Sequence, residues 1–155
     1  MRYLFSAVVC LIWALWLGGL CAVGLTAYAI ARAFHGGGDA MATANSSMFH
    51  RFEQYELILA AASLLATFGW VLARRSTMKT ALFTFLALSG ALAYFETTTI
   101  TPRIDKLRTE HKTATPSFQQ AHHWATEVYG AQTLILALGG LLLPLAFRAD
   151  QEKPV

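Results

Sequence analysis

Residues 80–100, TALFTFLALSGALAYFETTTI, form a long apolar segment whose only charged residue is Glu96. A helix of about 20 such residues crosses the ~30 Å hydrocarbon core of a bilayer. Three further apolar segments occupy residues 4–33, 57–73 and 124–147. Because backbone groups in lipid must be hydrogen-bonded within the chain, each segment is predicted to be a membrane-spanning helix.

The composition supports this interpretation. Hydrophobic residues make up 55% of the 155-residue chain and charged residues 14%, whereas a soluble domain has about 45–50% and ~25%. Soluble, disordered and small disulfide-rich classes are thereby excluded. The predicted fold is all-α: one domain, residues 1–155, forming a four-helix transmembrane bundle with up-down-up-down topology and both termini on the same side. The first segment is too long for a signal-peptide core, so we expect it to be retained. Polar connections are predicted at 35–50, 74–79 and 102–121.

The charge pattern points to a lipid bilayer as the partner. The net charge is +3, from twelve Lys and Arg against nine Asp and Glu, and the basic residues are scattered at segment ends, so nucleic acid is not expected. Basic residues divide equally between the two sides of the bundle. The short, acid-free turn with Arg74, Arg75 and Lys79 favours cytoplasmic termini under the positive-inside rule.

Ionisable residues within or beside the spans gather on one side of the bundle, and the other half of the spans holds no charge. In the predicted topology the start of the second helix, the end of the third and the start of the fourth meet at one membrane face. At 1.5 Å per residue, three carboxylates lie roughly 8–10 Å in from their loops. Charged residues inside a membrane usually mark a functional site. The residues concerned are Glu53, Glu56, Glu96, His122, His123 and Glu127.

Several carboxylates with one or two imidazoles suit a divalent or transition-metal ion. Glu53 and Glu56 share a helix face, as do His123 and Glu127. Haem is not expected, because His122 and His123 point about 100° apart on a helix. No nucleophile or substrate site accompanies the carboxylates, so an enzyme is not favoured. The predicted metal ligands are Glu56, Glu96, His122, His123 and Glu127.

Other interpretations of this layer remain open. The carboxylates and histidines could form a structural polar network, in which buried charges pair with one another. They could also form a proton path or an organic-ligand pocket. A binding protein is expected to occur alone or as a homo-oligomer. The alternative is a non-catalytic accessory subunit bound to other membrane subunits.

The order of several short motifs resembles the transmembrane protein 205-like family and its bacterial relatives, whose shared domain has no characterised function. The first helix carries a Trp-Leu-Gly-Gly motif, the third ends in a Pro-Arg-Ile stretch, and a Phe-x-x-x-His motif precedes the fourth. The corresponding residues here are Trp13, Trp16-Leu17-Gly18-Gly19, Phe49-x-x-Phe52, Pro102-Arg103-Ile104, Leu107-Arg108 and Phe118-x-x-x-His122.

This resemblance covers about residues 13–147 and implies a four-helix membrane fold in a bacterial inner membrane. Two positions depart from the family pattern: Ala125 stands where a small hydroxyl residue is common, and Tyr129 or Gly130 where an Asn is common. Glu96 and Glu127 are not recognised as family residues, so the resemblance assigns no chemistry to them.

Overall fold

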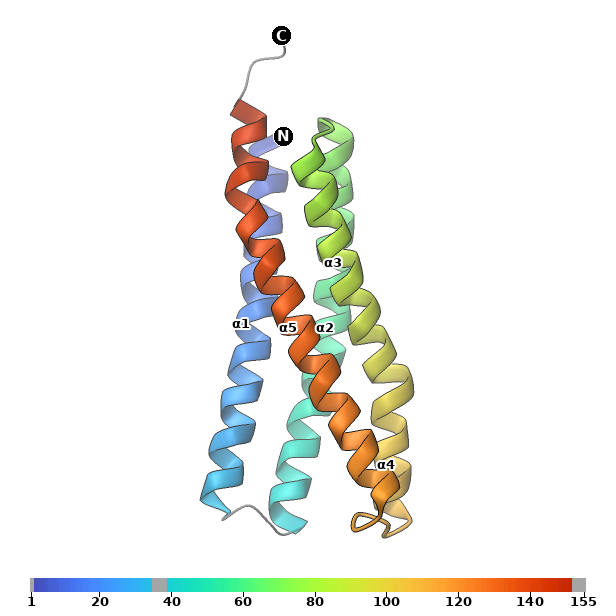
Figure 1. Ribbon diagram of the computed structural model, residues 1–155. Coiled ribbons are helices and arrows are strands. Elements are labelled where there is room, and N and C mark those ends of the chain that lie inside the picture. The colour runs from blue at the N-terminus through green and yellow to red at the C-terminus, as the bar shows by residue number, and fades with distance from the viewer. Residues whose placement is uncertain (1, 35–38, 152–155) are drawn as a thin grey trace.

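The computed structural model describes residues 2–34 and 39–151 and confirms the four-helix bundle (Figure 1). The third membrane-spanning unit is built from three consecutive helical segments, and each of the others is a single helix. The elements are α1 (Arg2–Ala33), α2 (Asp39–Ala73), α3 (Thr77–Phe95), the π-helix η1 (Glu96–Ile100), α4 (Thr101–Thr109) and α5 (Pro116–Gln151).

The helices alternate in direction, so Arg2 and Gln151 lie at the same end of the bundle (Figure 1). The most extensive helix–helix interfaces are α3 with α5 and α1 with α2. We name the two ends by their side chains. The arginine end, at the top of Figure 1, carries the described Arg74, Arg75 and Arg148. The histidine end, at the bottom, carries the described His50, His111, His122 and His123.

Two helices are longer than predicted. Residues 39–50, predicted as a connection, are helical and extend α2 to Asp39; residues 35–38 lie outside the described part. The helix α5 begins at Pro116, inside the predicted connection 102–121, and only residues 110–115 separate it from α4. Both extensions are polar, but they contain good helix formers such as Ala, Met and Gln. The apolar segments therefore predicted the part of each helix that suits a lipid environment, but they did not predict where each helix begins.

The surface chemistry is that of an integral membrane protein. Four helices are long and apolar enough to cross a bilayer. Large apolar side chains point outward along them, for example Leu25, Leu65 and Leu141, each at least 70% exposed. In a soluble protein such faces would drive association, whereas in a bilayer they contact lipid tails.

The interior is closely packed around two tryptophans. Trp16 on α1 and Trp70 on α2 are fully buried, together with leucines from α3 and α5. A Cβ atom added to Gly140 of α5 would overlap the ring of Trp13, so glycine permits this close approach of α5 to α1. The Trp13 indole N–H donates to the Leu136 carbonyl at 2.8 Å, which also joins these two helices.

The π-helix η1 has a local cause in the sequence. Pro102 has no backbone N–H, and in an α-helix its ring would clash with the carbonyl of Thr98. Directly before Pro102, the helical turn is widened to hold one extra residue. The Thr101 N–H donates to the Glu96 carbonyl five residues back. Such single-turn insertions often occur at functional sites, and this one begins at the only charged residue of the segment 80–100.

Candidate functional site

Three glutamates from two elements meet in the interior of the bundle. Glu53 and Glu56 lie one turn apart on α2, and Glu96 begins η1. All three are buried, with exposed fractions of 6%, 3% and 7%. We call Glu53, Glu56 and Glu96 the carboxylate cluster. It lies deeper than predicted: because α2 begins at Asp39, Glu56 is about 25 Å along the helix from that end, at 1.5 Å per residue.

Glu56 is held by neutral donors from two other helices. The Trp16 indole N–H of α1 donates to its Oε1 at 2.7 Å, and the Gln132 side-chain amide of α5 donates to the same oxygen. Trp16 and Gln132 are both fully buried. Hydrogen bonds to a carboxylate are stronger than neutral ones, so Glu56 links α1, α2 and α5 at this level of the bundle.

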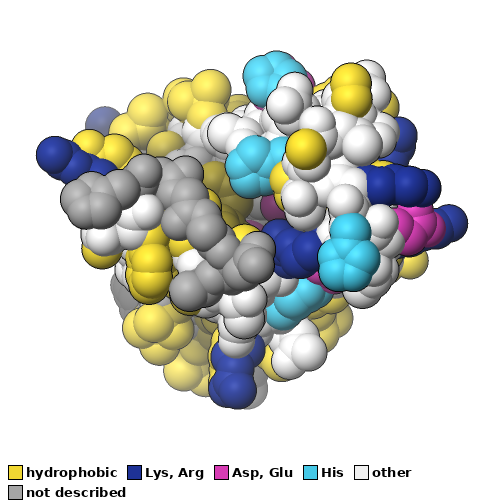
Figure 2. Space-filling view, turned by 90° about the horizontal axis from the view of Figure 1, so that it is seen from below, with side chains coloured by type: hydrophobic (Ala, Val, Ile, Leu, Met, Phe, Trp, Pro, Cys, Tyr) yellow, Lys and Arg dark blue, Asp and Glu magenta, His cyan; other side chains and the backbone are white. Residues whose placement is uncertain are grey.

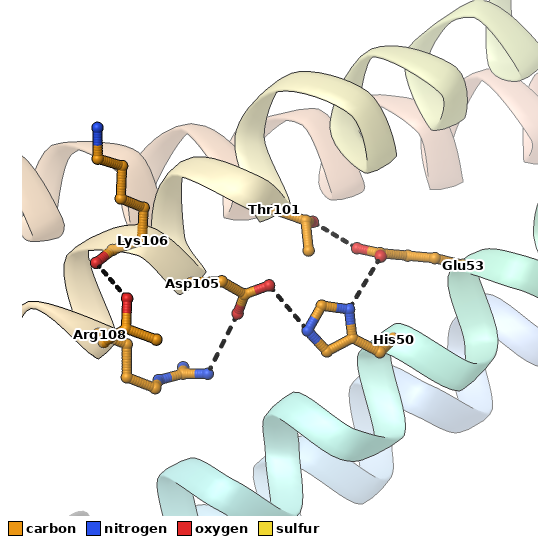
Figure 3. Close-up of polar contacts among 7 residues, drawn as sticks. His50, Glu53, Thr101, Asp105, Lys106 and Arg108 are labelled. Atoms are coloured by element: carbon orange, nitrogen blue, oxygen red, sulfur yellow. Dashed lines mark hydrogen bonds and ion pairs between the residues drawn. The ribbon is translucent and has the colours of Figure 1, made fainter.

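Glu53 lies on the side of the cluster nearer the histidine end and accepts a hydrogen bond from Thr101. The Thr101 hydroxyl, at the first position of α4, donates to Glu53 Oε1 at 2.5 Å. The other carboxylate oxygen, Oε2, lies 3.7 Å from Nδ1 of His50, one helical turn earlier on α2. Figure 3 shows these contacts and the imidazole pointing from α2 toward α4.

His50 continues this line of groups to Asp105 on α4. The Asp105 carboxylate Oδ2 lies 3.0 Å from His50 Nε2, and its Oδ1 lies 3.6 Å from the Arg108 guanidinium (Figure 3). Exposure falls along the line: the side chains of His50 and Asp105 are 43% and 36% exposed, and that of Glu53 is 8% exposed. A continuous set of titratable groups thus leads from the surface to the carboxylate cluster.

Glu96 differs from the other two glutamates because no described residue binds its carboxylate. Among the described residues, none gives its carboxylate a hydrogen bond or an ion pair. It lies close enough to Glu56 and Glu53 to be repelled by both. Gln132 Oε1 and the Thr97 hydroxyl are also buried without a hydrogen-bonding partner. Buried polar groups at this level are therefore incompletely satisfied.

The five predicted metal ligands do not converge. Glu56 and Glu96 lie in the carboxylate cluster, but His123 and Glu127 lie on the outer face of α5, 71% and 60% exposed, and pair with each other at 3.0 Å. His122 is also exposed and stacks on Phe118. Within residues 2–34 and 39–151, no group of three or more His, Cys, Asp and Glu side chains is arranged to hold a metal ion.

The rotation of α5 explains why these three residues point away. The inward line of this helix passes through Ala121, Gln132 and Leu136, which are all buried. His122 and His123 follow Ala121 by one and two residues, which turns them about 100° and 200° from it.

Sequence reasoning missed the partners of the carboxylates. Trp16 was interpreted as part of a family motif and Asp105 as part of a connection, and Thr101 was given no role, but all three contact the cluster or lead to it. Figure 2 looks onto the histidine end, where His side chains gather with Lys and Arg side chains around acidic ones. The aqueous end of the line is therefore a mixed-charge surface.

No protein-family model matches the chain, and no curated protein or solved structure matches it. The resemblance to the transmembrane protein 205-like family stays a prediction.

Proposed function

We propose that the protein binds a cation in its carboxylate cluster and that this cation is a proton held at Glu96. The observation that carries the proposal is the buried carboxylate of Glu96, which has no described donor or counter-ion and two carboxylates as neighbours. An ionised carboxylate in a low-dielectric interior is strongly disfavoured unless it is paired. Protonation removes the charge and supplies a hydrogen-bond donor beside two other carboxylates.

A proton fits this site better than a metal ion. Metal binding needs several ligands that converge with defined geometry, and three of the five predicted ligands lie on the outer face of α5. One oxygen of Glu56 already accepts two hydrogen bonds. A proton needs only one oxygen and its nearest acceptor.

The functional consequence is a membrane protein whose interior charge follows the pH on one side of the bilayer. Glu56 joins α2 to α1 and α5 through its hydrogen bonds, and Glu96 of η1 interacts electrostatically with it, so a change of protonation at Glu96 acts where all four spans meet. The alternative role as an accessory subunit of a larger assembly stays a prediction.

Infrared difference spectroscopy tests the proposal directly. The full chain is reconstituted in lipid nanodiscs with ¹³C-labelled glutamate, and the C=O band of protonated carboxyl groups is followed between acid and alkaline pH. We expect a band that persists at a pH where exposed glutamates are ionised. It should disappear in Glu96→Gln and remain in the matched control Glu110→Gln, an exposed glutamate outside the spans.

Two results would overturn this assignment. One is a carboxyl band that is the same in the wild type and in Glu96→Gln. The other is a near-stoichiometric metal, detected by elemental analysis of chelator-free wild-type protein and absent from Glu96→Gln, which would replace the proton by a metal ion.

A further inference from the structure

We propose that His50 transfers protons between water at the histidine end and the carboxylate cluster, with Asp105 on its outer side and Glu53 on its inner side. This inference rests on the proposed function, since it names the route by which the proton reaches Glu96. It gives a role to a histidine that is not among the predicted ligands and to an aspartate on a different helix.

The first argument is the position of the imidazole between two carboxylates. Its Nε2 lies 3.0 Å from Asp105 and its Nδ1 lies 3.7 Å from Glu53. Histidine is the side chain best suited to relay protons near neutral pH, because it can accept at one nitrogen and donate from the other. Both nitrogens of His50 face a group that can exchange a proton with it (Figure 3).

The second argument is the gradient of exposure. Asp105 and His50 are each more than one-third exposed, so water reaches them, whereas Glu53 is almost fully buried. From Glu53 inward, the next titratable groups are Glu56 and Glu96, which interact electrostatically with it. The route therefore runs from an exposed pair to a buried group without passing the lipid-facing surface.

The third argument is the balance of charge around the ring. The groups that face His50 are Glu53 from its own helix and Asp105 from α4, and Arg108 of α4 in turn pairs with Asp105. Among the described residues, α1 and α5 supply no charged partner to the ring. A proton exchanged at the ring therefore has a carboxylate acceptor on either side, and the outer carboxylate also pairs with Arg108.

The transfer itself changes only N–H and O–H bonds. A proton arriving from the Asp105 side binds Nε2, and the imidazolium then releases the Nδ1 proton to Oε2 of Glu53. The 3.7 Å separation exceeds a direct hydrogen bond, so a small rotation of the half-exposed ring precedes the second step. A half-turn of the ring about its Cβ–Cγ bond returns an unprotonated nitrogen to the Asp105 side.

A pH-jump experiment on the same reconstituted protein tests this route by rate. After a rapid pH jump, the rise of the Glu96-dependent carboxyl band is followed in time. In His50→Ala we expect the rise to slow by roughly tenfold or more, by analogy with the loss of a proton-transfer residue, while its final amplitude is unchanged. Free imidazole added to the buffer should restore the rate.

The matched control is His123→Ala, because His123 is also a histidine of the histidine end with a carboxylate at 3.0 Å. It should leave the rate unchanged with and without imidazole. Asp105→Asn, which keeps the size of the side chain, should slow the rise as well.

The outcomes separate the two proposals. An unchanged rate in His50→Ala, with the Glu96-dependent band intact, would refute the route and leave the proton site standing. Slowing that imidazole does not rescue would assign His50 a structural role and also refute the route. The absence of any Glu96-dependent band in the wild type would refute the proposed function and this inference together.

Discussion

The two ends of the bundle bury opposite charges, and the partners of these charges differ. Toward the arginine end, the ammonium of Lys79 is fully buried; it donates to the Arg74 carbonyl at 3.2 Å and lies 4.9 Å from the centre of the Trp70 ring. Toward the histidine end, Trp16 uses the edge of its indole instead and donates its N–H to Glu56. The same residue type thus stabilises a cation with its face and an anion with its edge.

The difference lies in how completely the charge is satisfied. Lys79 has its partners close by, in the turn before α3 and on the neighbouring α2. The carboxylate cluster holds three acids and leaves Glu96 without a described partner. A fully satisfied buried charge serves as a structural element, whereas an incompletely satisfied one calls for a ligand. We therefore assign the function to the acidic half of the bundle.

The largest expected effect is the loss of either tryptophan, which tests whether the two halves are equally well packed. Trp16→Ala and Trp70→Ala should each lower the free energy of unfolding by about 3–5 kcal/mol, because each removes a fully buried ring. Both losses are measured by circular dichroism while the protein is unfolded with SDS in mixed micelles with a mild detergent. A loss below about 1 kcal/mol in one variant only would show that its half is loosely packed.

Replacement of Lys79 tests whether the arginine end is purely structural. Lys79→Met should lower the free energy of unfolding by about 1–2 kcal/mol, through loss of the cation–π contact with Trp70 and the hydrogen bond to the Arg74 carbonyl. The infrared carboxyl band should stay as in the wild type, because the ammonium lies in the other half of the bundle. A shift of that band would mean that the two halves are electrostatically coupled.

A smaller effect is expected from Trp16→Phe, which keeps an aromatic ring but removes the N–H donor to Glu56. Hydrogen bonds inside membrane proteins contribute about 0.6 kcal/mol on average and up to about 1.7. The same unfolding measurement gives this value. The control is the same substitution in a Glu56→Ala background, where the acceptor is absent; equal losses in the two backgrounds would assign the whole effect to ring size.

The smallest effect concerns an exposed ion pair outside the spans. Lys112, at 2.7 Å, lowers the pKa of Glu110 through a hydrogen bond and its positive charge. A carboxyl group with a lowered folded-state pKa adds stability above its unfolded pKa and loses it as the pH falls through the folded value. The difference in stability between the wild type and Glu110→Gln should thus exist at pH 7 and vanish in strong acid. A difference that grew toward acid pH would contradict this sign.

The fold followed from the sequence because each span is long, apolar and nearly free of charge. The half of the bundle that holds Glu56 and Glu96 followed as well, because the alternating topology brings the start of the second helix and the end of the third to one membrane face. The depth of Glu56 did not follow, since α2 begins at Asp39 and not near residue 50. The burial of Lys79 did not follow, since the basic turn 74–79 gave no sign that α3 begins at Thr77. The outward direction of His123 and Glu127 did not follow either, because side-chain packing sets the rotation of α5.

The His50–Asp105 contact was the least predictable part of the site, because the two residues are far apart in sequence and belong to different helices. Neither residue type carries a signal for its partner at that distance. Only the register of α4 against α2 brings them together.

That register depends on the extra residue of η1. Before it, the inward side of α3 passes through Leu82, Leu86 and Ala93. A regular α-helix would carry this line on through positions near 104 and 107, at 3.6 residues per turn. With one residue inserted, the phase advances by about 100°, and Thr101, Asp105 and Arg108 take the side that faces α2. The contact between His50 and Asp105 therefore depends on the number of residues between Glu96 and Asp105 as much as on which residues these are.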